Sequence, residues 1–335
     1  MDWIRPCFFA PSGRQQHTIT GGDILAIVQT NVPMTSALCQ QTIRQLTDTY
    51  PFLATEELTT TAFGNPVTAL SLGRGSRRTL YTAAHHANEW ITATVLLKFI
   101  EELCEAVRTG GSIFGVPASI ILDNCAVFFV PMVNPDGVDL VTGAIEPGSL
   151  PYEAARNIAD NYPLIPFPDG WKSNVLGTDL NLQYPAGWLK AREIKFSQGF
   201  FRPAPRDYVG RAPLNQRETI ALAQYTEDID PKLVLAYHTQ GNVIYWQFDD
   251  YEIPGARELG EEFARLSGYT LADTPENSAY AGYKDWFIQN FRRAGYTIEC
   301  GIGESPLPLA QFDQIYKDNL GILVTAALGL PGGKA

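Results

Sequence analysis

The sequence contains few cysteines and none in a close pair. Five occur in 335 residues, and no two of them form a C-x-x-C motif. The odd number leaves at least one thiol unpaired, which favours a reducing compartment. The start of the chain has no apolar run of signal-peptide length, and no stretch approaches the ~20 apolar residues that a membrane span needs. We therefore expect a cytoplasmic protein without a membrane partner.

Positive charge is also scarce. The chain has 25 lysines and arginines against 36 acidic residues, which gives a formal net charge of −11. This balance argues against nucleic acid or an anionic membrane surface as the main partner. Hydrophobic residues make up 45% and charged residues 18% of the chain. Such a composition is typical of a folded protein, and the length allows two average domains or one large α/β domain.

The apolar pattern predicts strands that alternate with helices. Helices are expected at about 35–48, 90–107, 215–228, 254–267, 283–291 and 308–328, and strands at about 67–72, 78–83, 127–130, 233–238 and 296–300. This order predicts a single α/β domain over residues 35–335, with a mixed, mostly parallel β-sheet and helices on both faces. Residues 1–34 are expected to form a strand-like leader segment, with LysM ancestry as a minor alternative.

Three segments between these elements carry further signals. Gly73-Arg74-Gly75 separates two predicted strands and predicts a hairpin. Asn134-Pro135-Asp136-Gly137 predicts a turn after a buried strand. Residues 145–213 are rich in proline, glycine and aromatic residues with little periodicity, and such a long irregular segment is more often a functional surface than a linker.

Histidine is rare, and two of the four histidines stand in a pattern that suits a metal. His86 and Glu89 lie where a short β-prone run meets a helix, and their spacing lets both side chains point toward one ion. His238 ends the apolar run 233–237, which a buried strand would deliver to the carboxyl edge of the sheet. Two histidines and one carboxylate, with a fourth position left for water, are typical of a catalytic zinc site with one zinc per chain. A junction histidine that only packs and hydrogen-bonds is the alternative.

Glu299 is a candidate general base. It lies in the short β-prone run 296–300 between apolar neighbours, and partial desolvation there would raise its pKa toward the range that is useful for taking a proton from water. The alternative is a structural glutamate paired with Arg292 or Arg293.

Five motifs in order resemble the zinc carboxypeptidase family over about residues 35–330. They are His86-x-x-Glu89, Asn134-Pro-Asp-Gly137, Gly177-Thr-Asp-Leu-Asn181, His238 and Thr297-Ile-Glu299. Longer phrases look like the bacterial γ-D-glutamyl-L-diamino acid endopeptidase branch, which cuts peptidoglycan stem peptides. These are His86-Ala-Asn-Glu-Trp-Ile91, Phe167-Pro-Asp-Gly-Trp-Lys172, Tyr237-His-Thr-Gln-Gly241 and Gly301-x-Gly-x-x-Pro-Leu-Pro308.

The resemblance implies a set of catalytic roles. Zinc would be held by His86, Glu89 and His238, and Glu299 would act as base and then as acid on a metal-activated water. Lys172 falls where the family carries the arginine that polarises the scissile carbonyl, although a lysine supplies the charge without the bidentate fork. Asp179 is implied either to support a ligand or to shape a turn.

The substrate contacts depart from the family pattern. Carboxypeptidases place an arginine after the motif asparagine to clamp the terminal carboxylate of the substrate, but here Asn181 is followed by Leu182. Arg206 and Tyr280 are candidates to take over carboxylate contacts, with a surface ion pair as the alternative for Arg206.

Lys284, two residues before Trp286, matches the family position at the floor of the pocket for the residue after the cleaved bond. A cation there would favour the side-chain carboxylate of meso-diaminopimelate. A lysine that merely faces solvent is the alternative.

The leading hypothesis is a zinc peptidase that hydrolyses the γ-D-glutamyl-L-diamino acid bond of muropeptides. The alternative enzyme is an ordinary metallocarboxypeptidase, or an amidohydrolase of the same fold that acts on acylated amino acids. A non-catalytic binding module is the third possibility, which the presence of all three ligands and the glutamate argues against.

Overall fold

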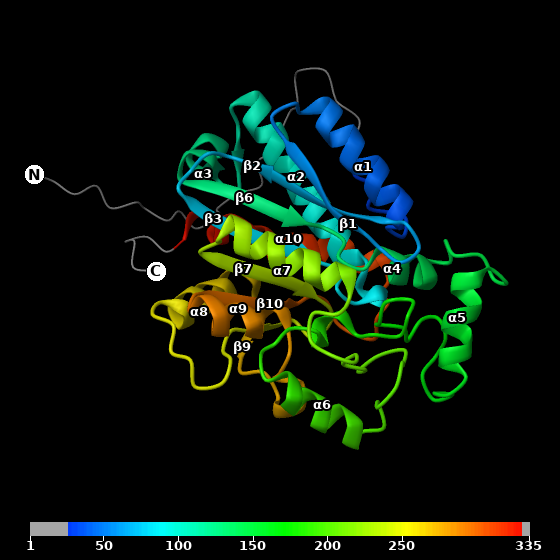
Figure 1. Ribbon diagram of the computed structural model, residues 1–335. Helices are drawn as coiled ribbons and strands as arrows, with labels where there is room; N and C mark the ends of the chain where they lie inside the picture. The colour runs from blue at the N-terminus through cyan, green and yellow to red at the C-terminus, as the bar shows by residue number, and fades with distance from the viewer. Residues whose placement is uncertain (1–25, 330–335) are drawn as a thin grey trace, which may run out of the picture.

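The centre of the fold is a mixed β-sheet, which a computed structural model describes within residues 26–329 (Figure 1). In this part of the chain the sheet has eight strands in the order β1, β2, β6, β3, β7, β10, β8, β9. Their bounds are β1 Ala54–Thr60, β2 Pro66–Leu72, β3 Arg77–Ala83, β6 Cys125–Val130, β7 Leu233–His238, β8 Val243–Tyr245, β9 Thr270–Ala272 and β10 Ala294–Glu299. The short strands β4 (Ser112–Ile113) and β5 (Val116–Pro117) pair separately.

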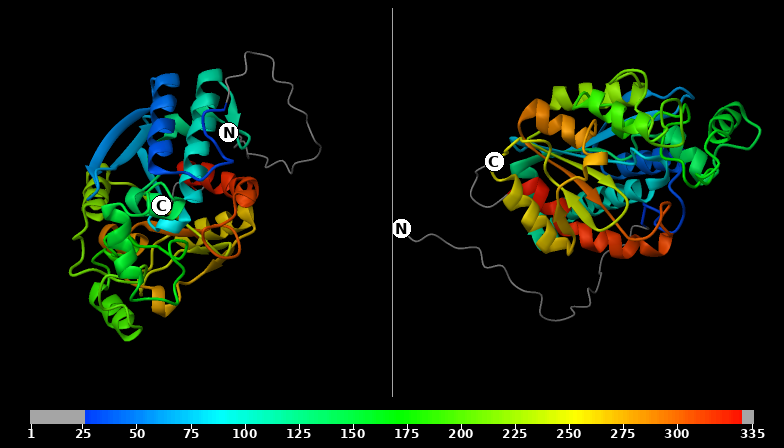
Figure 2. Two further views of the ribbon diagram at one scale, coloured as in Figure 1. Left: turned by 90° about the vertical axis from the view of Figure 1, so that its right-hand side faces the viewer. Right: turned by 90° about the horizontal axis from the view of Figure 1, so that it is seen from below.

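Helices cover both faces of this sheet, as the predicted α/β fold requires (Figure 2). Helices α2, α8 and α10 pack on one face, and α7 and α9 pack on the other. The helices are α1 Ser36–Thr49, α2 Ile91–Thr109, α3 Ala118–Asn124, α4 Pro135–Thr142, α5 Leu150–Ala159, α6 Trp188–Ser197, α7 Arg217–Ile229, α8 Ala256–Ser267, α9 Tyr283–Phe291 and α10 Phe312–Leu328. The predicted single α/β domain with a mostly parallel sheet is confirmed.

The burial of the central strand β7 on both faces explains why its sequence is apolar without interruption. Every residue from Leu233 to His238 is buried. Val234 and Ala236 pack in the core beneath α7 and α9, whereas Leu235 and Tyr237 pack in the core on the opposite face. A parallel strand covered on both faces needs apolar residues at every position.

The predicted hairpin between β2 and β3 is wrong, because β6 lies between these two strands. β6 pairs antiparallel with β2 and parallel with β3. Gly73 and Gly75 allow this insertion, since a Cβ atom at Gly75 would lie 1.9 Å from the carbonyl carbon of Asn124 and one at Gly73 would lie 2.3 Å from the oxygen of Cys125. The glycines therefore mark the close approach of the segment that enters β6 rather than a tight reversal.

The segment predicted as a turn at Asn134 begins a helix instead. The Asn134 side chain accepts a hydrogen bond from the N–H of Gly137, and Pro135 occupies the first turn of α4. Both are favourable at a helix start. The irregular segment 145–213 also contains α5 and α6, which its weak periodicity did not indicate.

The sequence also predicts a leader segment over residues 1–34 and no membrane-spanning segment. The LysM-like stretch and most of the leader segment lie outside the described residues, so the boundary at residue 34 stays a prediction. Within residues 26–329, no helix combines the length and the apolar character that crossing a bilayer requires.

Candidate metal centre and active site

The site forms where three parallel strands end side by side. β3, β7 and β10 are neighbours in the sheet, and they run in the same direction. His238 is the last residue of β7, and it lies in register with Glu299, the last residue of β10. His86 and Glu89 follow β3 closely. The carboxyl edge of the sheet therefore collects the four residues that the sequence singled out.

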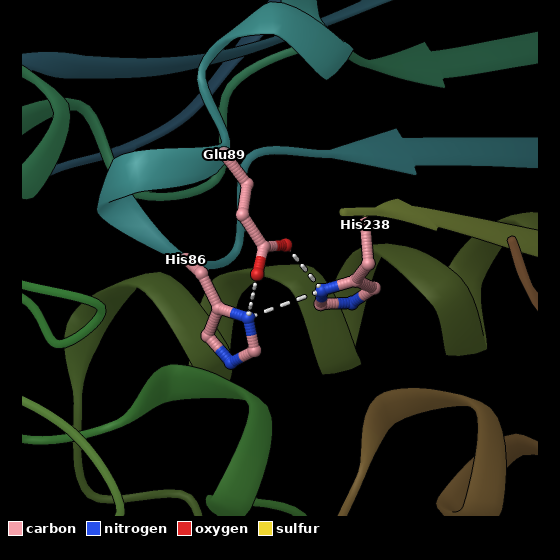
Figure 3. A group of neighbouring side chains, drawn as sticks. All are labelled: His86, Glu89 and His238. Carbon is pink, nitrogen blue, oxygen red and sulfur yellow. Dashed lines mark hydrogen bonds and ion pairs between the residues drawn. The ribbon is translucent and has the colours of Figure 1, made fainter. Parts of the chain in front are cut away.

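His86, Glu89 and His238 converge on one point (Figure 3). Nδ1 of His86 lies 2.9 Å from Oε1 of Glu89, Nδ1 of His238 lies 2.9 Å from Oε2 of the same carboxylate, and the two nitrogens are 3.2 Å apart. In a tetrahedral zinc site with bonds of about 2.0–2.2 Å, the donor atoms lie roughly 3.3–3.6 Å apart. The spacing and the chemistry of these three groups therefore fit a zinc ion.

The electrostatics around His86 also favour a cation. Burial lowers the pKa of its imidazole, but the carboxylates of Glu89 and Asp179 outweigh this effect and raise the pKa to about 9. Asp179 approaches the far ring nitrogen of His86, with Oδ1 3.2 Å from Nε2. A carboxylate in this position fixes the orientation of a histidine ligand and increases its basicity.

Asp179 also shapes the local chain. Its contacts therefore fit both roles considered for it, supporting a ligand and shaping a turn. Its Oδ1 accepts the N–H of Asn181, and its Oδ2 accepts the N–H of Asp207. Asp179 thus ties the Gly177–Asn181 motif to a loop 28 residues further along the chain.

A short 3-10 turn over Ala87–Glu89, rather than the helix start itself, presents the first two residues of the cluster. The hydroxyl of Thr92 donates to the carbonyl of Glu89 at 2.7 Å and accepts the N–H of Ala84 at 3.0 Å, which closes the turn. The neighbouring His85 is fully buried and stacks on His238, with ring centroids 5.6 Å apart. His85 is therefore the packing histidine of this junction.

Glu299 is not the ion-paired glutamate of the alternative interpretation. Arg293 pairs with Asp230 at 2.5 Å, and the guanidinium of Arg292 lies over the ring of Tyr251. Burial raises the pKa of the Glu299 carboxyl above its usual range, although His238 opposes this shift. A half-buried carboxyl with a raised pKa beside the cluster is suited to proton transfer.

Two cavities adjoin the cluster, and Lys172 and Arg206 line both of them. The metal-side cavity has a volume of about 200 Å³, and its lining includes His86, Asn181, Lys195, Lys284 and Glu299. The second cavity measures about 630 Å³ and extends from Lys172 and Arg206 past Asn88 and Gln240. The two cavities thus meet at a pair of cations.

Lys172 and Arg206 have different surroundings at this meeting point. The Lys172 ammonium lies 2.9 Å from Oε1 of Glu89. Arg206 is 43% exposed, and its Nε donates to Oδ2 of Asp207 at 2.7 Å. The ion pair considered for Arg206 therefore exists, but the guanidinium belongs to the walls of both cavities.

Lys284 lines the metal-side cavity and does not face solvent, since its side chain is only 4% exposed. Its ammonium donates to the carbonyl of Gln247 at 2.6 Å, lies 2.5 Å from Oδ1 of Asp285, and makes a longer contact of 3.4 Å with the hydroxyl of Thr274. The cavity therefore presents a lysine and an aspartate side by side.

Asn181 and Tyr280 differ in their access to the cavity. Asn181 lines it, and its Oδ1 accepts the N–H of Tyr283. Tyr280 is not among the described residues that line either cavity. Its ring packs against Gly187 and Phe248 instead, so the geometry gives no support to a carboxylate contact from Tyr280.

Sequence reasoning missed the pair Lys195 and Asp207. Their charged groups lie 2.6 Å apart at the wall of the metal-side cavity, and Lys195 is 7% exposed. α6 has almost no amphipathic pattern, and Asp207 stands in irregular chain, so nothing in the sequence indicates that they meet.

Comparison with known proteins agrees with this geometry. The zinc carboxypeptidase family model matches residues 39–321. The γ-D-glutamyl-L-diamino acid endopeptidase 1 of Lysinibacillus sphaericus is 42% identical over 284 residues, which cover 84% of this chain and 69% of that protein.

Solved structures show the same fold. The crystal structure of thrombin-activatable fibrinolysis inhibitor aligns with a TM-score of 0.69 at 17% identity, over 89% of this chain and 74% of that one. Carboxypeptidase A from Helicoverpa armigera aligns with a TM-score of 0.66 at 16% identity, over 90% of this chain and 75% of that one. With the match of the family model over most of its length and a buried cluster that fits zinc, the chain belongs to the zinc carboxypeptidase family and is a zinc-dependent peptidase.

Proposed function

We propose that this peptidase hydrolyses the γ-D-glutamyl-L-diamino acid bond of peptidoglycan stem peptides, with meso-diaminopimelate after the cleaved bond. The observation that carries the proposal is the pair of cavities that meet beside the metal cluster. This arrangement leaves room for a substrate on both sides of the scissile bond. The similarity to the Lysinibacillus endopeptidase supports the same bond type.

In this proposal His86, Glu89 and His238 hold the zinc, and Asp179 orients His86. When bound, zinc lowers the pKa of a coordinated water and polarises a carbonyl. Glu299 takes the proton of the attacking water and then delivers it to the leaving amine. Lys172 lies between the two cavities, where its ammonium can stabilise the negative charge that develops on the scissile carbonyl oxygen.

The metal-side cavity would receive the diamino acid. The side chain of meso-diaminopimelate ends in a carboxylate and an ammonium on one carbon. Lys284 and Asp285 present the complementary pair of charges, and their contact of 2.5 Å places these charges next to each other. The long contact from Lys284 to Thr274 is the one that a substrate carboxylate would replace. Asn181 would contact the substrate through its amide nitrogen, since its oxygen is engaged by Tyr283.

Lys284→Met is expected to reduce the preference for diaminopimelate over lysine substrates. A charge-assisted hydrogen bond to the side-chain carboxylate is worth ~1.5–3 kcal/mol. The wild-type protein should therefore cut γ-D-Glu-diaminopimelate about ten- to a hundredfold faster than γ-D-Glu-Lys. The variant should lose most of this ratio by slowing the diaminopimelate substrate. The measurement is kcat/KM for both peptides.

Lys190→Met provides the matched control, because Lys190 is an exposed lysine of α6. Zinc content should be the same in wild type and both variants. A Lys284→Met enzyme that keeps the wild-type ratio would show that Lys284 does not read the substrate.

A panel of defined peptides tests the proposed reaction as a whole. The zinc-loaded protein should cleave tri- and tetrapeptide stems at the γ-D-Glu-diaminopimelate bond, with products identified by mass spectrometry. It should act poorly on α-linked peptides with an ordinary C-terminal residue and on acylated amino acids. Efficient release of C-terminal residues from α-linked peptides would favour the ordinary carboxypeptidase, and rapid hydrolysis of acylated amino acids would favour the amidohydrolase.

The cytoplasm is the compartment that we propose for this reaction. Cys39, Cys104, Cys125 and Cys300 are buried and unpaired in the part of the chain that the structure describes. Unpaired thiols are the rule in a reducing compartment.

A further inference from the structure

The second cavity contains one cation whose hydrogen-bonding groups are largely unused. Of the two cations in its wall, Lys172 contacts the Glu89 carboxylate. Arg206 uses only Nε, on Asp207, and its two terminal nitrogens contact no group within residues 26–329 by a hydrogen bond or ion pair. The guanidinium can therefore offer a bidentate fork, the geometry that recognises a carboxylate.

A buried acceptor lines the same cavity. Asn88 is 3% exposed, and its amide nitrogen donates to the backbone oxygens of Asp169 and Ser305. These two bonds fix the orientation of the amide, and they leave Oδ1 buried without a partner in the described chain. A buried carbonyl oxygen without a donor is costly, so a ligand N–H that reaches it is favoured.

The charges in the cavity wall differ between the part near Asn88 and the part near Lys172 and Arg206. Asp169 and Glu304 line the cavity on the side of Asn88, next to the backbone groups that hold its amide. They repel an anion there, whereas Lys172 and Arg206 attract one at the end next to the metal cluster. The cavity therefore suits a group that presents a carboxylate to the two cations and an N–H to Asn88.

A γ-linked glutamyl residue has this pattern. Its γ-carboxyl forms the scissile amide, so its α-carboxylate stays free, four bonds from the carbonyl carbon that is attacked. Its α-nitrogen is an amide N–H when the stem peptide continues. An ordinary α-linked residue has no free carboxylate at this place. We propose, on the basis of the proposed endopeptidase function, that Arg206 binds the α-carboxylate of the γ-glutamyl residue and that Asn88 accepts its amide N–H.

Arg206 thus binds the residue before the cleaved bond rather than the terminal carboxylate of the substrate. Arg206 then selects γ-linked over α-linked acyl groups. Selection at this position is independent of the diamino acid, which occupies the metal-side cavity.

The test uses two substrates that differ only at the α-carboxylate. One stem peptide contains γ-D-glutamate, and the other contains its α-carboxamide, D-isoglutamine, before the same diaminopimelate. Wild type should cut the carboxylate form about ten- to a hundredfold faster, in kcat/KM, because the amide cannot pair with the guanidinium. Arg206→Gln should bring the two rates within about threefold by slowing only the carboxylate form.

Arg202→Gln is the control, since Arg202 is an exposed arginine of the same segment that lines neither cavity. It should keep the wild-type ratio, and all three proteins should hold the same amount of zinc. Equal wild-type rates on both substrates would overturn the role of Arg206 while leaving the proposed reaction standing. An unchanged ratio in Arg206→Gln would also overturn it. Failure of the wild type to cut either peptide would overturn both proposals.

Discussion

Glu299→Gln is expected to keep the fold and the zinc while lowering kcat by a factor of ~10²–10⁴, the usual cost of losing a positioned general base. Glutamine is nearly isosteric with glutamate but cannot accept the proton of the attacking water. Glu299 lies at the end of β10, in register with His238, and its burial raises the pKa of its carboxyl. The measurement is kcat on the γ-D-Glu-diaminopimelate peptide, together with zinc content by metal analysis.

The control for this experiment is an exposed glutamate, for which Glu252 is suitable. Glu252→Gln should turn over at the wild-type rate. If Glu299→Gln retained near-normal kcat, the role of base would have to pass to another carboxylate, and Glu304 is the next residue to substitute.

His238→Ala is expected to remove most of the bound zinc and, with it, the activity. The substitution deletes an Nδ1 atom that lies 2.9 Å from Oε2 of Glu89 and 3.2 Å from Nδ1 of His86. It also leaves the Glu89 carboxylate, which is almost fully buried, without one of its partners. Zinc content under limiting zinc should fall to a small fraction of the wild-type value.

His85→Gln separates the loss of a ligand from the loss of any histidine in this region, because His85 packs against His238 without belonging to the cluster. That variant should bind zinc, and circular dichroism should show that both variants are folded. A His238→Ala protein as zinc-loaded as wild type would refute the ligand assignment.

Elements buried on both sides could be predicted closely from the sequence. β7 and α9 lie at the predicted residues, because continuous or periodic apolar runs leave few alternatives. His86, Glu89, His238 and Glu299 could be found because strand and helix boundaries carry them. β1 was not found because most of its residues are exposed and no apolar alternation marks it.

Contacts that depend on distant segments could not be predicted in this way. The position of β6 between β2 and β3 depends on a close approach at Gly73 and Gly75, which a local pattern reads as a hairpin. Lys195 and Asp207 meet because the fold brings α6 against the loop of Asp207, whose N–H is held by the Asp179 carboxylate. Lys284 could be placed at the cavity by resemblance, but its partner Asp285 became apparent only from the fold.

The separation of the zinc donors along the chain links metal binding to folding. His86 and His238 are 152 positions apart, and they meet only when β3 and β7 are paired. An unfolded chain keeps His86 near Glu89 but lacks the third donor, so zinc binds the native state far more tightly. Such preferential binding stabilises the native state by ~2.7 kcal/mol when free zinc is a hundredfold above its Kd. Pairing over so long a loop is also slow to form. Zinc can therefore secure this fold once β3 and β7 have paired, but it cannot speed the search that brings them together.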